Sequence, residues 1–244
     1  MLIINADDWG RSVAETNVAL KCYTQGRITS VSGMVFMSDS RRAAKLAKDY
    51  QLDDVGLHLN FSEEFTDPKC PETLKQRHKR IIKFFRQSKY AQLLYNPFLR
   101  QAFAYSYRAQ LEEFMQLFAR SPSHIDGHHH MHLCANLLLS NLIPAGTKMR
   151  RNFSFWPGEK SWLNRKYRAL VDRWLGRRYQ LTDYFFDLTQ CIEGKKMDRV
   201  AALAKSKNVE LMTHPQVSTE EEYLMGDAFR EILQRLEVGG YALV

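Results

Sequence analysis

Short apolar runs alternate along the chain with longer amphipathic stretches, and this alternation predicts an α/β fold with a mainly parallel sheet. The strand-like runs are residues 2–6, 29–37, 54–60, 123–127, around 147–151, 184–189 and 208–213, with a last apolar run at 241–244. Helical patterns cover residues 12–25, 40–50, 72–92, 98–120, 195–206 and 219–237. A chain of 244 residues without repeats or low-complexity linkers fits one domain of the size of an α/β barrel.

Two adjacent carboxylates, Asp7 and Asp8, follow the first apolar run, Leu2-Ile3-Ile4. They lie where a strand would end, which is the edge at which α/β proteins build active sites. A pair of buried carboxylates is costly unless a cation or a hydrogen-bond network neutralises it. Taken alone, such a pair could instead cap a helix, because Asp accepts amide hydrogen bonds at helix N-termini.

Histidines stand at the ends of other strand-like runs. His58 lies near the end of 54–60, and His214 follows 208–213, where Pro215 prevents the strand from continuing. A single histidine at a strand end is more often structural than a metal ligand, and we interpret His78 in this way. The repeated coincidence of strand ends with Asp or His favours a metal site over separate structural roles.

The segment 124–132 is rich in histidine. The spacing of His124 and His128 places both imidazoles on one side of either a strand or a helix. Gly127 indicates that the strand ends there, which leaves His128 at the mouth of a site and turns Asp126 towards a ligand or a neighbouring imidazole. The remaining histidines of the segment are expected to line a pocket: His129, His130 and His132.

Four segments together resemble the motifs of the YdjC-like carbohydrate deacetylases, which include the chitooligosaccharide deacetylases. They agree with that family in order and spacing, and they are Asn5–Gly10, Gly56–Leu59, His124–His132 and Met212–Pro215. Two positions depart from the family, since Trp9 stands in place of the usual Phe and Gly127 in place of the usual Ser. The resemblance implies an irregular (β/α) barrel of about seven mainly parallel strands.

The resemblance also implies roles for individual residues. Asp8, His58 and His128 would bind one divalent metal ion. Asp7 would act as the general base and His214 as the general acid. The reaction would be hydrolysis of the N-acetyl group of an acetylated amino sugar, carried on an oligosaccharide or a glycolipid. The family implies Mg²⁺, whereas a mixed Asp/His donor set also suits Zn²⁺ or another transition metal.

The four cysteines lie far apart and form no C-x-x-C pair, and the chain starts directly in a strand-like run without a leader segment. No apolar run reaches the length of a transmembrane helix. We therefore expect a cytoplasmic protein. Cys134, beside the histidine-rich segment, is interpreted as a small buried hydrophobic residue and not as a ligand.

The net charge of +8 is concentrated in two segments, 75–89 and 148–178. The first is typical of a solvated helix face. In the second, Trp156, Trp162 and Trp174 lie among Arg and Lys, within or beside a region without clear periodicity at 152–180 that we interpret as an insertion or lid. This composition fits sugar stacking, an anionic membrane surface or nucleic acid.

Two function classes follow from these patterns. The first is the metal-dependent deacetylase, which acts on an N-acetylated sugar or glycolipid, with peripheral contact to an anionic membrane and a homodimer as possible associations. The second is a non-catalytic binding protein for anionic surfaces or nucleic acid on a deacetylase scaffold. We favour the enzyme, and do not expect nucleic acid as a partner, because all five proposed metal and catalytic residues are present.

Overall fold

The computed structural model describes residues 1–244, which form two compact units. The first unit contains Met1–Asp7, Asn17–Val31 and Ala145–Val244, and the second contains Asp8–Thr16 and Ser32–Pro144. The strand order is β4-β3-β2-β1-β6-β5. Two strands, β1 (Leu2–Trp9) and β2 (Ser30–Gly33), contribute residues to both units. The extent of a single enzyme domain over 1–244 stays a prediction.

In the first unit, β1 pairs in parallel with β6 (Val209–Thr213), and β6 pairs in parallel with β5 (Tyr184–Asp187). All five residues of β6 are buried, as expected for a strand with a neighbour on each side. The register aligns Ala6 with Thr213 and Asp187 with Met212. Asp7, which follows the last residue of β1 paired with β6, and His214, which follows β6, therefore lie at the same edge of the first unit's sheet.

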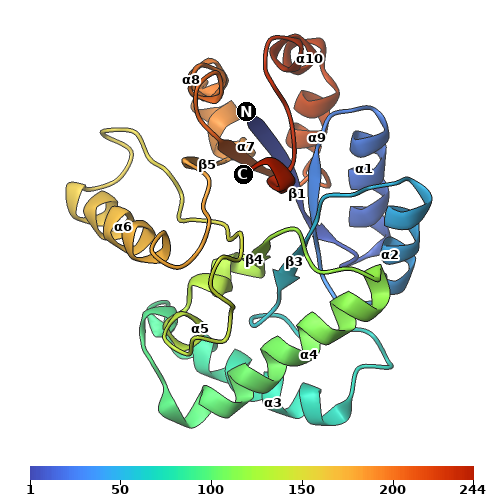
Figure 1. Ribbon diagram of the computed structural model, residues 1–244, viewed down its shortest axis with the longest axis vertical. Helices are drawn as coiled ribbons and strands as arrows, with labels where there is room; N and C mark the ends of the chain where they lie inside the picture. The colour runs from blue at the N-terminus through green and yellow to red at the C-terminus, as the bar shows by residue number, and fades with distance from the viewer. The chain divides into compact units, whose positions relative to one another are not determined.

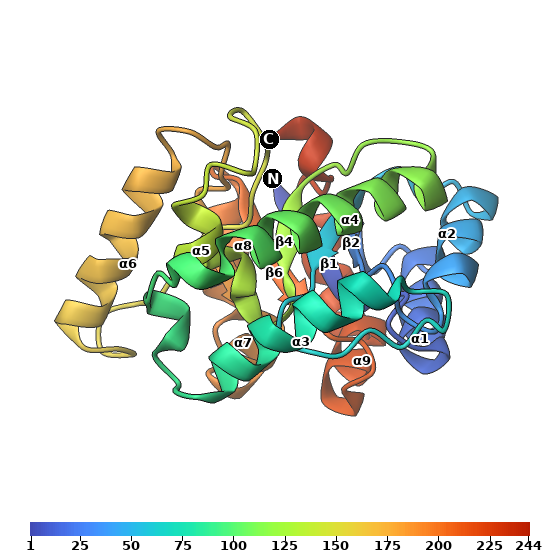
Figure 2. The same ribbon diagram turned by 90° about the horizontal axis from the view of Figure 1, so that it is seen from below.

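In the second unit, β3 (Val55–Leu59) pairs in parallel with β4 (Ile125–Gly127), which aligns His58 with Asp126. Two long helices, α3 (Glu72–Arg86) and α4 (Arg100–Phe118), lie side by side in this unit (Figures 1 and 2). The ring of Phe103 in α4 packs against that of Phe85 in α3, with ring centroids 5.9 Å apart. It also packs against Phe61, which follows β3, with ring centroids 5.1 Å apart. The same unit contains α2 (Ser40–Asp49) and the short α5 (Ala135–Leu138).

The remaining helices belong mainly to the first unit. They are α6 (Trp162–Leu175), α7 (Leu188–Glu193), α8 (Met197–Ala204), α9 (Ser218–Met225) and α10 (Asp227–Gln234), while α1 (Val13–Thr24) begins in the second unit and continues in the first. None of the helices is both long and apolar enough to cross a membrane.

The alternation of strands and helices is confirmed, but the structure has six strands where the resemblance implied about seven. Residues 147–151 form only one isolated bridge, from Lys148 to Gln180, where a seventh strand was expected. Tyr241–Leu243 is a 3₁₀ turn, not a strand. The expected helix at 219–237 is two helices, separated at Gly226, whose backbone is extended.

The region 152–180, for which no periodicity was found, contains α6. Ser161 begins this helix as its N-cap, since its hydroxyl accepts a hydrogen bond from the backbone N–H of Asn164. Leu175 of this helix is fully buried, whereas most of its other apolar residues are exposed.

Candidate functional site

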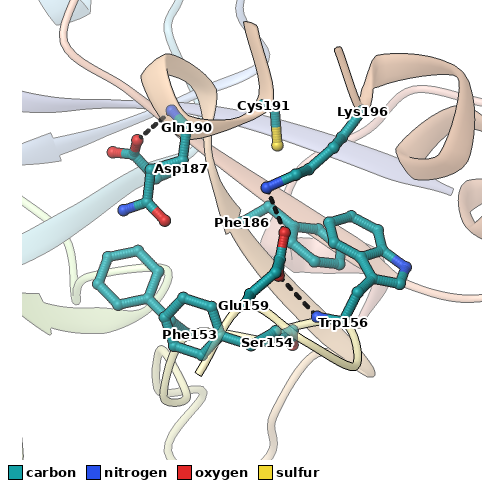
Figure 3. A pocket seen from close by; sticks show the side chains of 10 residues that line it. Phe153, Ser154, Trp156, Glu159, Phe186, Asp187, Gln190, Cys191 and Lys196 are labelled. Carbon is teal, nitrogen blue, oxygen red and sulfur yellow. Dashed lines mark hydrogen bonds and ion pairs between the residues drawn. The ribbon is translucent and has the colours of Figure 1, made fainter. Parts of the chain in front are cut away.

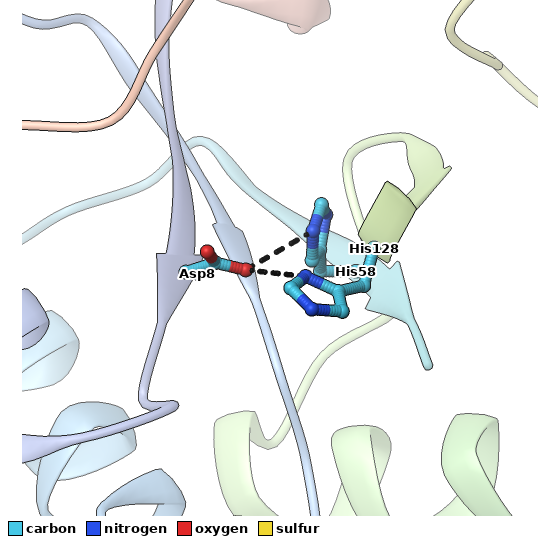
Figure 4. A group of neighbouring side chains, drawn as sticks. All are labelled: Asp8, His58 and His128. Atoms are coloured by element: carbon cyan, nitrogen blue, oxygen red, sulfur yellow. Dashed lines mark hydrogen bonds and ion pairs between the residues drawn. The ribbon is translucent and has the colours of Figure 1, made fainter. Parts of the chain in front are cut away.

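Asp8, His58 and His128 converge in the second unit (Figure 4). One ligand atom from each side chain lies within 4.8 Å of the others. Asp8 Oδ1 is 2.9 Å from His128 Nδ1 and 3.4 Å from His58 Nε2. All three residues are buried, so the cluster brings one carboxylate and two imidazoles together away from bulk water.

The backbone at the end of β1 is adapted to present Asp8. The φ angle of Asp8 is +64°, in the left-handed region that non-glycine residues seldom adopt, and Gly10 follows with φ +89°. Trp9, between them, is fully buried, and its indole N–H donates a hydrogen bond to the carbonyl of Ala43 at 3.2 Å. Such a conformation persists where the surrounding packing fixes it, which is common at functional sites.

The carboxylate of Asp126 contacts the ring nitrogen of His58 that faces away from Asp8. His58 Nδ1 lies 2.9 Å from Asp126 Oδ1, while its Nε2 faces Asp8. The other oxygen of Asp126 accepts a hydrogen bond from the Ser32 hydroxyl at 2.7 Å, and this hydroxyl also lies 3.1 Å from His124 Nε2. A carboxylate that orients a histidine in this way is typical of metal-binding imidazoles.

The donor set fits a divalent cation. His128 Nε2 is buried and makes no hydrogen bond, although Glu63 Oε2 lies 3.2 Å away. Burial alone would raise the pKa of Asp8, but the hydrogen bonds from His128 and His58 and their charges outweigh it and lower that pKa. Asp8 is therefore an ionised carboxylate, which together with two imidazoles suits Zn²⁺ or a similar ion and leaves coordination positions open.

Sequence reasoning missed the residues around this cluster. Glu63 lies in a loop after β3, where no periodic pattern marks it, and Arg11 holds both of its oxygens, at 2.8 and 3.0 Å. Hydrogen bonding to Glu63 raises the pKa of the Arg11 guanidinium, so it stays charged. Arg11 also pairs with Glu15 four residues later in the chain.

Asp7 belongs to the first unit and has a different environment. Arg150 binds both of its carboxylate oxygens, at 2.7 and 2.6 Å, and Asn5 donates a further hydrogen bond at 2.8 Å. Arg150 also donates to Glu210 at 2.7 Å, and the hydroxyl of Tyr241 hydrogen bonds with Glu210. All of these side chains are buried. The sequence showed Arg150 only as one member of a basic segment.

His214, after β6, lies beside two carboxylates of the first unit, Asp187 and Glu220. Their ligand atoms lie within 4.8 Å of one another, so these residues form a second group of metal-binding type. Both Glu220 oxygens already accept hydrogen bonds, from the Thr189 hydroxyl and from the backbone N–H of His214, each at 2.5 Å. Burial raises the pKa of Glu220 and of Asp187, so burial disfavours the ionised form of both carboxyl groups.

A shallow hollow that is partly open to solvent lies next to Asp187 in the first unit (Figure 3). Trp156 stacks on Phe186 along one wall, with ring centroids 4.5 Å apart and an angle of 8° between the planes. Asp187 and Gln190 contribute polar groups, and Lys196 forms an ion pair with Glu159. The hollow thus has an aromatic wall and polar edges, and the expected lining of a pocket by His129, His130 and His132 stays a prediction.

The other histidines of the second unit have individual roles. His124 is fully buried and hydrogen bonds with Ser32 and Ser123, so it does not join His128 in the cluster. His129 is exposed and lies 3.0 Å from the Ser62 hydroxyl, and its ring packs 4.0 Å from that of His128. Cys134 is 1% exposed at the start of α5, and burial raises its pKa to about 12, as expected for a small hydrophobic residue.

The chain matches the family described as YdjC-like protein over residues 1–235 and belongs to this family. It is 31% identical to a chitooligosaccharide deacetylase from Proteus mirabilis (strain HI4320), over 54% of this chain and 50% of that protein. It is 26% identical to a chitooligosaccharide deacetylase from Enterobacter sp. (strain 638), over 88% of this chain and 81% of that protein. The first of these matches spans about half of the curated relative's length.

A solved structure shares the fold. It is a crystal structure of a protein from Enterococcus faecalis V583 described as a cellobiose-phosphate cleavage protein, with a TM-score of 0.70 and 19% identity. The superposition covers 99% of this chain and 97% of that one. At this identity the likeness concerns the fold alone.

Proposed function

We propose that this protein is a metal-dependent hydrolase that removes the N-acetyl group from an acetylated amino sugar. The observation that carries the proposal is the convergence of Asp8, His58 and His128 in a buried cluster, with Asp126 orienting one imidazole. The chain is also related to proteins named chitooligosaccharide deacetylases. The metal ligands would be Asp8, His58 and His128.

A bound divalent ion would polarise the amide carbonyl of the substrate and make a water molecule more acidic. Asp7 would accept the proton from this water as the general base. The two hydrogen bonds from Arg150 support this role, because they fix the orientation of the Asp7 carboxylate and compensate its charge. Mg²⁺ is the ion that the family resemblance implies, whereas the two imidazoles suit Zn²⁺ or another transition metal better.

His214 would donate a proton to the amine that leaves. A general acid must present a protonated nitrogen to the leaving group, and its ring must be oriented for that transfer. The carboxylates of Asp187 and Glu220, close to the imidazole, can accept a hydrogen bond from one ring nitrogen and so hold the other in place.

The hollow beside Asp187 would bind a sugar ring. Ligand sites combine apolar walls with a few polar groups that fix orientation, and the faces of Trp156 and Phe186 offer such a wall for the C–H face of a pyranose. The substrate would be an N-acetylated oligosaccharide or glycolipid. A homodimer and a cytoplasmic location remain predictions from the sequence.

Acetate release from a panel of N-acetylated sugars, with and without added Mg²⁺ or Zn²⁺, tests the proposal. We expect metal-dependent release by the wild type and none by Asp8→Ala. The matched control is His78→Gln, which alters a buried histidine of the same unit outside the cluster and should keep the activity. No release from any sugar by the metal-loaded wild type would instead support a binding protein on a deacetylase scaffold.

A further inference from the structure

The helix α6 exposes a continuous apolar stripe. Leu163, Tyr167, Leu170 and Trp174 are 71%, 50%, 68% and 40% exposed, and their spacing of four, three and four residues places them on one helix face. Trp162, at the start of the helix, is 61% exposed. In both views α6 lies apart from α7 and α8 of its own unit (Figures 1 and 2).

Two charged residues of α6, Arg168 and Asp172, lie on the side of the helix that packs against the first unit. Asp172 is buried, where Arg151 and Asn152 hydrogen bond with it at 2.8 and 2.9 Å. Arg168 is half-buried and lies over the ring of Phe155, at 5.2 Å from its centroid. A surface helix normally turns its apolar stripe inward and its charges to water. Packing within the first unit therefore does not account for the stripe.

Cations accompany the exposed stripe. Lys166 and Arg173 are exposed and lie next to it by the helical period of 100° per residue, and Arg177 is exposed just after the helix. The single acidic residue of α6 is Asp172, whose charge is compensated inside the fold. The outward face is thus both apolar and positively charged, which complements a surface that is apolar below and negatively charged above.

We propose that the outer face of α6 docks on a lipid bilayer that contains anionic phospholipids. Leu163 and Leu170 would enter the boundary between headgroups and acyl chains, while Lys166 and Arg173 would remain among the phosphates. Trp162 and Trp174 stand near the two ends of the helix and suit the interfacial layer. A helix of 14 residues spans about 21 Å, so the contact lies in the plane of the membrane.

A second copy of the chain is a poorer occupant of this face. Two α6 helices packed together would bring Lys166 and Arg173 of one copy near the same cations of the other, without exposed acidic residues on the helix to compensate them. The bilayer proposal does not depend on deacetylation, because none of these residues belongs to the proposed metal or acid-base site.

Co-sedimentation with vesicles tests the proposal directly. The wild type should bind vesicles of phosphatidylcholine mixed with phosphatidylglycerol, should bind phosphatidylcholine alone weakly, and should be released by added salt. The double substitution Leu163→Glu and Leu170→Glu should reduce the partition coefficient more than tenfold, because it removes the two leucines that would be buried in the bilayer. The matched control, Leu94→Glu with Leu139→Glu, removes two leucines that are each 58% exposed and adds the same charge, and it should bind like the wild type.

Light scattering on the same samples measures the oligomeric state and so tests whether a second copy of the chain covers this face instead. If the wild type is dimeric, the α6 variant is monomeric and neither binds vesicles, the face joins two copies and the bilayer proposal is wrong. It is equally overturned if the control variant loses binding as strongly as the α6 variant, because the effect would then come from charge alone. Circular dichroism confirms that both variants are folded before binding is compared.

Discussion

Asp7 and Asp8 are consecutive residues of β1, yet their charges are compensated in different ways. In the first unit, Asp7 meets the permanent charge of Arg150, which contacts both of its oxygens. In the second unit, the carboxylate of Asp8 contacts the imidazoles of His58 and His128. A guanidinium stays protonated at any ordinary pH, whereas an imidazole does not, so the partner that contacts Asp7 is permanently charged and the partners that contact Asp8 are not.

This difference indicates what each carboxylate can do. A carboxylate held by a bidentate guanidinium keeps its orientation but has little capacity left for a metal ion. A carboxylate beside two imidazoles is one donor of a mixed set that a divalent cation completes. On the proposed function, an acid-base role and a ligand role would fall to neighbouring residues, and the following variants test that separation.

The largest expected contrast is between Asp8→Asn and Asp7→Asn. Asp8→Asn should lose most of its metal after dialysis, as measured by elemental analysis, because the anionic ligand is gone. Asp7→Asn should retain the metal and lose acetate release by about 10²–10⁴-fold, because an amide cannot accept the proton. If Asp7→Asn loses the metal and Asp8→Asn keeps it, the two roles are exchanged.

Arg150→Met tests whether Asp7 depends on its counterion. The substitution leaves Asp7 and Glu210 buried without a cation, so the free energy of unfolding should fall by about 3–5 kcal/mol in urea titrations. Arg151→Met is the matched control. Its partner Asp172 is less enclosed and Arg151 is 21% exposed at the side chain, so the loss should be smaller. Equal losses in both variants would contradict a special role for the Asp7 ion pair.

His78 provides a buried histidine of the second unit that has no carboxylate partner. Its Nε2 lies 2.8 Å from the carbonyl of Glu63, and burial lowers its pKa from 6.5 to about 4. Between about pH 6.5 and 4, His78 binds a proton in the unfolded chain but not in the folded chain. The contribution of His78 to the free energy of unfolding is therefore complete above pH 6.5 and is lost as the pH falls towards 4. The loss amounts to about 3 kcal/mol.

The measurement is the free energy of unfolding of the wild type and of His78→Gln between about pH 7 and about pH 4. The wild type should lose more stability than the variant over this range. A difference between the two proteins that does not change with pH would show that folding does not lower the pKa of His78.

Asp126→Asn should have the smallest of these effects. The amide can still contact His58 but no longer supports the imidazole with a negative charge, so the metal affinity should fall by about 10–100-fold in chelator competition. Asp54→Asn is the control, since Asp54 contacts Ser123 and His124 and none of the proposed ligands. An unchanged affinity in Asp126→Asn would mean that the orientation of His58 does not depend on this carboxylate.

The sequence predicted the elements that carry the site. Apolar runs of four to eight residues marked β1, β3 and β6, because buried parallel strands need apolar side chains on both faces. The ends of these runs identified Asp8, His58 and His214 as candidates, and the structure places the first two in one cluster with His128. Their catalytic use remains a proposal.

Other features depended on contacts that no local pattern records. Arg150 lies 143 residues from Asp7 and Glu63 lies 65 residues from His128, and side chains at such separations along the chain meet only when it has folded. The exposure of the apolar face of α6 was hidden for a related reason: the spacing of apolar residues marks one face of a helix, but it does not show whether another part of the chain covers that face.

The sequence by itself determined which residue types stand at the strand ends, since this follows from hydrophobic period and from the position of turn residues. Only the tertiary structure decided how the charge of each carboxylate is compensated. Electrostatic energy depends on distance and on burial, and neither quantity is set by position along the chain. Asp7 and Asp8 share a peptide bond, and their different partners were brought to them by folding.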